Sequence, residues 1–212
     1  MLKVDVVSII TSDLPSDDGL ADFANHAGIE CFRGDPDDVL SRMLAASNHY
    51  SLDNIISVTA DNPWVCPFWA KNLLDFSLSR NLDYGRISGL PFGSFCYFLK
   101  KTAIQKACLI KATKDTEVWG GYFDEKFGFN SEVLEVPKNS AVHRPNYRLT
   151  VDTPEDFLLA EAIANRVEPR ASSGVLTLGE IVEFLDSAPD VVGLNANIIQ
   201  AVVTAIEVKQ GI

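Results

Sequence analysis

Positive charge is scarce in this sequence of 212 residues. Only 18 lysines and arginines stand against 29 aspartates and glutamates, which gives a formal net charge of −11. A chain of this charge has no basic patch to neutralise a phosphate backbone, so a general nucleic-acid binder is excluded. A nucleotide substrate is not excluded, because a bound divalent cation can reverse the electric field locally.

Membrane segments and metal-binding cysteine motifs are also missing. No apolar run reaches the length of a membrane-spanning helix, and no signal peptide is recognisable. The four cysteines have no CxxC spacing and no histidine cluster beside them. We therefore expect a soluble, cytoplasmic protein without membrane insertion, with reduced cysteines and no zinc site. The hydrophobic content of 47% excludes a disordered chain.

Strand-like and helix-like segments alternate over the first eighty residues. Residues 4–10 (VDVVSII) and 54–59 (NIISVT) are rich in β-branched side chains, as is typical of strands buried on both faces. The alternation predicts an α/β domain whose parallel strands are joined by right-handed crossovers. We expect this domain to span residues 1–167. A helical appendage should occupy residues 168–212, with a last helix over residues 198–208.

The segment RLTVDTPEDF, residues 148–157, is the most informative one. Residues 147–151 predict a short strand, which places Asp152 at the strand's carboxyl end. Thr153 is a good N-cap and Pro154 suits the first helical position, so a helix should follow. Open α/β sheets bind ligands at the carboxyl ends of their strands. Asp152 is therefore either a cap of this helix or a ligand-binding carboxylate.

A second carboxylate has the same kind of position. Asp61 follows the strand-like residues 54–59 and precedes Pro63. By itself, Asp61 would favour an Asx turn that bonds its own backbone. Two carboxylates at neighbouring strand ends, however, form a minimal Mg²⁺ site, which water and substrate phosphates complete. The pair Asp61 and Asp152 therefore predicts a magnesium site.

Arginines frame a third cluster, RGDPDDVLSR, residues 33–42. Arg33 ends a strand-like segment. The guanidinium group matches phosphate oxygens in bidentate geometry, which favours a contact with a triphosphate. For Arg42, an ion pair with Asp38 on a solvated helix face is an equally good interpretation.

Taken together, these segments resemble a known family. TADNP (residues 59–63), FRGDPDDVLSR (32–42) and RLTVDTPEDF are similar to segments of cytidylyltransferase-like proteins of the spore coat polysaccharide biosynthesis protein F type. Those proteins are related to the synthetases that activate sialic and ketodeoxyoctulosonic acids as CMP-sugars. KDTEVWGGYF (114–123) and the tail LTLGEIVEFLDSAPDVVGLN (176–195) also resemble family segments. The resemblance implies a Rossmann-like nucleotide-diphospho-sugar transferase (GT-A-like) fold, an α/β/α sandwich with a mixed, mostly parallel sheet.

The resemblance also implies roles for single residues. Asp61 and Asp152 would be catalytic Mg²⁺ ligands, and Glu117 would face the acceptor pocket. CTP and a sugar or sugar acid would be the substrates, Mg²⁺ the cofactor, and a homodimer a further expectation. The residues expected beside the nucleotide are Thr11, Ser12, Asp13, Arg33, Arg42, Ala60 and Asn62.

One family segment has no counterpart in this sequence. The family normally begins with a strand and a loop of the form QARMGSTRLPGK that wraps the triphosphate, whereas residues 4–10 correspond to the next strand. The leading expectation is Mg²⁺-dependent nucleotidyl transfer from CTP to a sugar for surface polysaccharide. The missing loop leaves three alternatives: a fragment of a longer protein, an inactive nucleotide- or sugar-binding homologue, or a sheet completed by a partner chain. A glycosyltransferase is disfavoured, because TADNP supplies only one acid of the expected DxD motif.

Overall fold

Two β-sheets organise the computed structural model, which describes residues 3–170, 174–200 and 206–209. The smaller sheet pairs two parallel strands, and the larger one has the order β3–β5–β4–β6. In the larger sheet β4 runs parallel to β6, whereas β5 is antiparallel to both of its neighbours. The predicted α/β class with a mixed sheet is therefore confirmed. The strands are β1 (Ser8–Ser12), β2 (Glu30–Gly34), β3 (Asn54–Ser57), β4 (Tyr84–Ser88), β5 (Tyr97–Lys100) and β6 (Ser131–Glu135).

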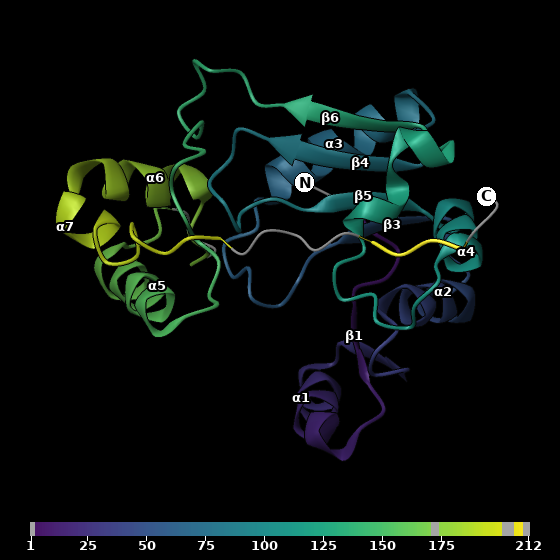
Figure 1. Cartoon of the computed structure of the whole chain (residues 1–212). Coiled ribbons are helices and arrows are strands. Elements are labelled where there is room, and N and C mark those ends of the chain that lie inside the picture. The colour runs from purple at the N-terminus through teal and green to yellow at the C-terminus, as the bar shows by residue number, and fades with distance from the viewer. Residues whose placement is uncertain (1–2, 171–173, 201–205, 210–212) are drawn as a thin grey trace.

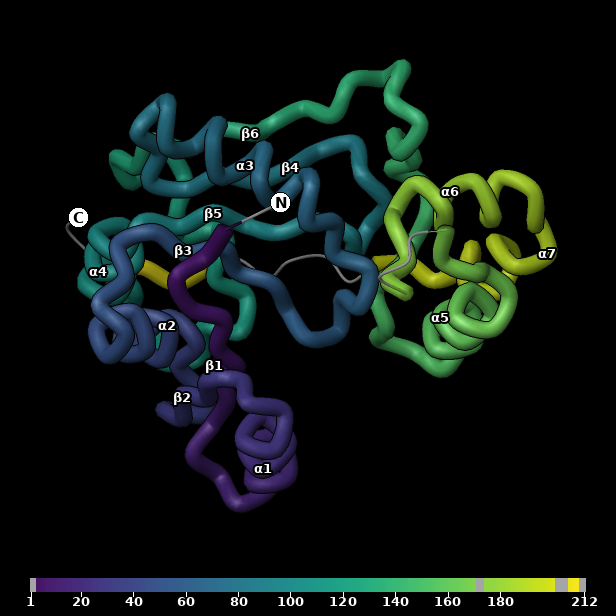
Figure 2. Tube along the Cα trace, turned by 180° about the vertical axis from the view of Figure 1, so that it is seen from behind, coloured from purple at the N-terminus to yellow at the C-terminus, as the bar shows by residue number. Residues whose placement is uncertain are grey.

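Helices connect the strands and gather at the two ends of the larger sheet (Figure 1). Helices α5, α6 and α7 lie together at one end, and α2 and α4 lie at the other, while β1, β2 and α1 project from the body in both views (Figures 1 and 2). No helix in the described part of the chain is long and apolar enough to cross a membrane. The helices are α1 (Asp18–Ala27), α2 (Val39–His49), α3 (Pro67–Ser79), α4 (Lys101–Ile110), α5 (Pro154–Arg166), α6 (Leu178–Ser187) and α7 (Pro189–Val192).

Alternating side chains of the larger sheet pack into two hydrophobic clusters. Phe98 of β5 packs in a cluster with residues of α3, α5, α6 and α7. Leu99, its neighbour on the opposite face, packs with α2, α4 and Trp119. The period of two in a strand explains this division. The carboxy-terminal helices thus share a core with the main sheet, while the predicted domain boundary at residue 167 stays a prediction.

The predicted strand over residues 147–151 is wrong. A single parallel bridge joins Phe92 to Arg148, and the chain then runs extended without a ladder. The opposite segment explains why: Pro91 cannot donate a hydrogen bond, and Gly93 turns the backbone away with φ +89°.

Other boundaries also differ from expectation. Strand β1 begins at Ser8 rather than at residue 4, and β4 was not anticipated. The predicted last helix falls partly on residues 201–205, which lie outside the described residues. Its described flanks, 198–200 and 206–208, are not helical.

Candidate active site

A backbone hydrogen bond brings the two predicted carboxylates to one place. The amide of Val151 donates to the carbonyl oxygen of Asp61 over 2.9 Å, so Asp152 is the next residue after this junction. Both Asp61 and Asp152 are exposed. The two acids that the sequence places at separate chain segments are therefore neighbours in the fold.

The turn that presents Asp61 is closed by its neighbours rather than by its own carboxylate. The amide of Asn62 donates to the Thr59 carbonyl over 3.2 Å, and Asn62 Nδ2 donates to Thr59 Oγ1 over 2.6 Å. The carboxylate of Asp61 accepts no hydrogen bond within the described ranges, so the Asx turn considered from sequence is not formed. Both of its oxygens are thus available to a ligand.

Arg148 fixes the orientation of Asp152. Its Nη2 donates to Asp152 Oδ2 over 2.7 Å and to Asp156 Oδ2 over 2.8 Å. The second oxygen of Asp152 accepts only a long 3.4 Å hydrogen bond from Thr150. The cap of α5 is Thr153, which forms a capping box with Asp156, so Asp152 does not cap this helix with its side chain. Asp152 is held through one oxygen and open at the other.

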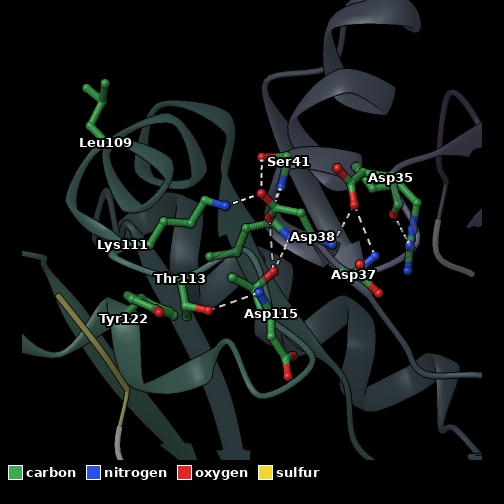
Figure 3. Close-up of polar contacts among 12 residues, drawn as sticks. Asp35, Asp37, Asp38, Ser41, Leu109, Lys111, Thr113, Asp115 and Tyr122 are labelled. Carbon is green, nitrogen blue, oxygen red and sulfur yellow. Dashed lines mark hydrogen bonds and ion pairs between the residues drawn. The ribbon is translucent and has the colours of Figure 1, made fainter. Parts of the chain in front are cut away.

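A buried network positions the loop that carries Glu117 (Figure 3). Asp38 is 5% exposed, forms an ion pair with Lys111, and accepts hydrogen bonds from Ser41 and Thr116. Thr116 is completely buried and also accepts a hydrogen bond from the amide of Leu40 over 3.0 Å. Because Glu117 follows Thr116 directly, its backbone is anchored. The ion pair between Arg42 and Asp38 that the sequence allowed is not formed.

A cavity of about 730 Å³ reaches the turn that presents Asp61. Glu117 lines it, as the family resemblance implied, and Thr59 of the Asp61 turn forms part of the same wall. Its other walls are largely aromatic: Tyr84, Phe95, Tyr97, Trp119 and Phe123. The rings contact one another, for example Tyr97 and Trp119 with centroids 5.2 Å apart. Such a surface suits the apolar face of a flat or cyclic ligand.

The predicted nucleotide-binding residues near the amino terminus form a separate group. Thr11 and Ser12 each donate to Asp17 Oδ2 over 2.6 Å, which lowers the pKa of Asp17 to about 2, the Ser12 bond being the stronger cause. Arg33 pairs with Asp18 at 2.7 Å.

Three further residues complete the predicted set. Asp13 is exposed, Arg42 donates to the carbonyl oxygens of Asp35 and Pro36, and Ala60 is exposed beside Asp61. No hydrogen bond or ion pair in the described structure joins Thr11, Ser12, Asp13, Arg33 or Arg42 to the acid pair. Of the predicted nucleotide residues, Ala60 and Asn62 lie beside Asp61, as its neighbours in the sequence.

Known proteins are similar to this chain in sequence. No family model matches the chain. It is 27% identical over 202 residues to an uncharacterized protein of Methanocaldococcus jannaschii, covering 93% of this chain and 80% of that protein. It is 26% identical over 189 residues to the spore coat polysaccharide biosynthesis protein SpsF of Bacillus subtilis, covering 88% and 77%. The chain is thus similar to SpsF over most of the length of both proteins.

A solved structure shares the fold of this chain. The structure of a cytidylyltransferase from Leptospira borgpetersenii matches it with a TM-score of 0.75 at 20% identity, covering 92% of this chain and 80% of that one. The family resemblance drawn from the sequence and the Rossmann-like α/β architecture are both confirmed.

Two residues of the site, Arg148 and Asn195, were not predicted from the sequence. Arg148 stood inside the quoted segment RLTVDTPEDF, and its spacing of four from Asp152 could have suggested an ion pair. Asn195 is 4% exposed and donates hydrogen bonds to the Arg148 carbonyl and to Asp156 Oδ1. No pattern in the neighbouring sequence predicts this long-range contact. The order of the sheet decides which distant segments meet.

Replacing Asp156 by asparagine should cost about 3 kcal/mol of unfolding free energy, because it leaves the charge of Arg148 without its buried partner. Although burial raises the pKa of Asp156, hydrogen bonds from Arg148 and Asn195 outweigh this and lower it to about 2. The folded pKa lies below the ordinary value of 3.8, so the wild-type stabilisation is present above about pH 4 and is lost as the pH falls toward 2.

Urea unfolding from pH 7 to pH 3 measures this effect. The wild type should lose stability across the acid part of this range, and Asp156→Asn should lose less. Asp190→Asn removes an exposed carboxylate whose ion pair with Arg166 spans 3.6 Å, so it serves as the control and should change little. Equal pH slopes for wild type and Asp156→Asn would contradict the assignment.

Proposed function

We propose that this chain is a Mg²⁺-dependent cytidylyltransferase that transfers the nucleotidyl group of CTP to a sugar for surface or spore-coat polysaccharide. The observation that carries the proposal is the hydrogen bond from the Val151 amide to the Asp61 carbonyl, which makes Asp61 and Asp152 neighbours at a turn whose Thr59 lines an aromatic cavity. Homology to SpsF supports the polysaccharide pathway, and the fold shared with the Leptospira cytidylyltransferase supports the choice of reaction.

The donor set of the acid pair fits Mg²⁺. Asp61 offers an unbonded carboxylate, and Asp152 offers Oδ1 while Arg148 holds its other oxygen. The described residues contain no group of three or more His, Cys, Asp or Glu side chains arranged for a metal. Two carboxylates suit Mg²⁺, which keeps several waters and binds substrate phosphates. When bound, the ion would neutralise charge that develops on the phosphates during transfer.

The chain's own residues would supply positioning. Arg148 keeps Asp152 in one orientation, and the anchored loop after Thr116 keeps Glu117 at the cavity wall, where its carboxylate can accept a hydrogen bond from a sugar hydroxyl. A hydroxyl held there would attack the α-phosphorus of CTP and give up its proton to solvent, while the bond between the α-phosphorus and the bridging oxygen breaks and pyrophosphate leaves. Positioning and charge stabilisation dominate phosphoryl-type transfers, so no covalent nucleophile is required.

Pyrophosphate release tests the proposal. The full chain is incubated with CTP, Mg²⁺ and a panel of neutral and acidic sugars, in parallel with ATP, GTP and UTP and with EDTA. We expect release that needs Mg²⁺, a sugar and CTP together. Binding of CTP by calorimetry without release from any sugar would instead identify an inactive nucleotide-binding homologue. Sugar transfer from a UDP-sugar would identify a glycosyltransferase. Either result contradicts the proposal.

A further inference from the structure

Arg86 differs from the other arginines in its contacts with the described residues. The chain has eight arginines, and seven of them form a hydrogen bond or an ion pair through the guanidinium group, the exposed Arg166 included. The side chain of Arg86 forms neither among the described residues. Arginine carries five donors and is always charged, so an unpaired guanidinium on a cavity wall is ready for an external acceptor.

The strand geometry places Arg86 beside the aromatic rings. Tyr84 and Arg86 are two residues apart on β4 and share one face of the sheet, while Gly85 packs against the opposite face, toward Leu73. Both Tyr84 and Arg86 line the 730 Å³ cavity. The ring centroids of Tyr84 and Phe123 are 5.1 Å apart, which makes this wall a continuous aromatic surface.

The same cavity is lined by Arg86 and by Thr59 of the turn that presents Asp61. Burial raises the pKa of Tyr97, the charge of Arg86 opposes this rise, and the charge of Asp61 adds to it. Tyr97 is therefore within electrostatic reach of both charged groups. Arg86, Tyr97 and Thr59 of the Asp61 turn line the same cavity, so a ligand lying on Tyr97 would be close to the guanidinium of Arg86.

The remaining charges of the cavity are negative. Glu117, Asp124 and Glu125 line it and are exposed, and Glu132 is already paired with Arg80 at 2.9 Å. Carboxylates accept hydrogen bonds from hydroxyl groups but repel a second anion. A ring with several hydroxyls and a single acidic group matches this distribution of charge.

We propose that Arg86 is a specificity-determining residue that binds a carboxylate or phosphate of an acidic sugar lying on the aromatic wall of the cavity. Calling this sugar the acceptor rests on the proposed function, whereas its binding does not. The guanidinium would hold the acidic group by charge-assisted hydrogen bonds, and the carboxylates of the cavity would accept hydrogen bonds from the hydroxyls. The acidic group that Arg86 binds would thus come from the sugar rather than from the triphosphate of CTP.

A matched series of sugars tests the assignment by calorimetric titration of the full chain. Glucose, glucuronate and glucose 6-phosphate share one ring and differ at carbon 6. We expect at least one of the two acidic sugars to bind about tenfold more tightly than glucose, since a charge-assisted bond is worth about this factor. Arg86→Gln should remove this preference, and Arg86→Lys should retain part of it. The thermal midpoint should change little, because Arg86 loses no hydrogen bond or ion pair of the described residues, and its charge acts on the exposed carboxylate of Asp124 only without direct contact.

Arg166→Gln is the control, since it removes the same charge from an exposed position whose ion pair is long, at 3.6 Å. It should keep the preference for acidic sugars. Equal affinities for all three sugars, or a preference that survives Arg86→Gln, would overturn the proposal. A separate titration with Mg²⁺ and CTP distinguishes the two sources of acidic groups: a loss of CTP affinity in Arg86→Gln, with sugar binding unchanged, would assign Arg86 to the nucleotide instead. Pyrophosphate release is measured independently, so failure of the proposed reaction would not be confused with failure of this binding.

Discussion

Replacing Asp152 by asparagine is expected to lower Mg²⁺- and CTP-dependent pyrophosphate release by about 100-fold or more, because one of two charged ligands is lost. The fold should persist. The Asp152 side chain is 38% exposed, and Arg148 keeps its stronger contacts with the buried Asp156. Initial rates at saturating Mg²⁺, together with thermal unfolding curves, separate the loss of chemistry from a loss of structure.

Asp61→Asn should have an effect of the same size, and the double variant should be little worse than either single one, since the two carboxylates act on one ion. Both variants should need more Mg²⁺ for half-maximal activity. Asp75→Asn is the control: Asp75 is 59% exposed and pairs only with Lys71 on the surface of α3. Activity that is unchanged in Asp152→Asn, at any Mg²⁺ concentration, would refute the metal assignment.

Local signals predicted much of the fold from the sequence. Thr153 caps α5 and Pro154 begins it, as the sequence predicts. These features depend on residues a few positions apart, where propensity and capping decide the structure. The neighbourhood of Asp61 and Asp152 could also be anticipated, because both follow strand-like segments and ligands gather at strand ends.

Features that depend on distant segments could not be predicted. The β-branched run before Asp152 forms no ladder, because its partner segment around Gly93 allows only one bridge. Strand β4 was overlooked because glycine and arginine interrupt its apolar pattern. Arg86, one of the two interrupting residues, lines the cavity. The aromatic wall joins Tyr84, Tyr97 and Trp119 from three separate segments, which only the order of the sheet brings together.

The segment around Gly93 packs closely against the two segments that carry Asp61 and Asp152, and this close packing requires a glycine. A Cβ atom at Gly93 would lie 2.3 Å from the backbone nitrogen of Thr150 and 2.9 Å from Asn62 Oδ1. Gly93 also has φ +89°, a conformation that costs L-residues about 1–2 kcal/mol. Since Thr150 and Asn62 belong to the two segments that carry Asp152 and Asp61, Gly93→Ala must push these segments apart. We expect a loss of about 3 kcal/mol or more of unfolding free energy, and lower activity in the fraction that folds.

Gly28→Ala separates backbone strain from the close contact. Gly28 also has positive φ, +66°, but nothing lies within 4 Å of a Cβ atom built there. This variant should therefore lose only about 1 kcal/mol and keep full activity. Urea unfolding and pyrophosphate release measured on both variants give the comparison. If Gly93→Ala lost no more stability than Gly28→Ala, the contact with Thr150 would not be what holds the two carboxylate segments in register. A stability loss in Gly93→Ala with unaltered specific activity would show that the distance between Asp61 and Asp152 tolerates the shift.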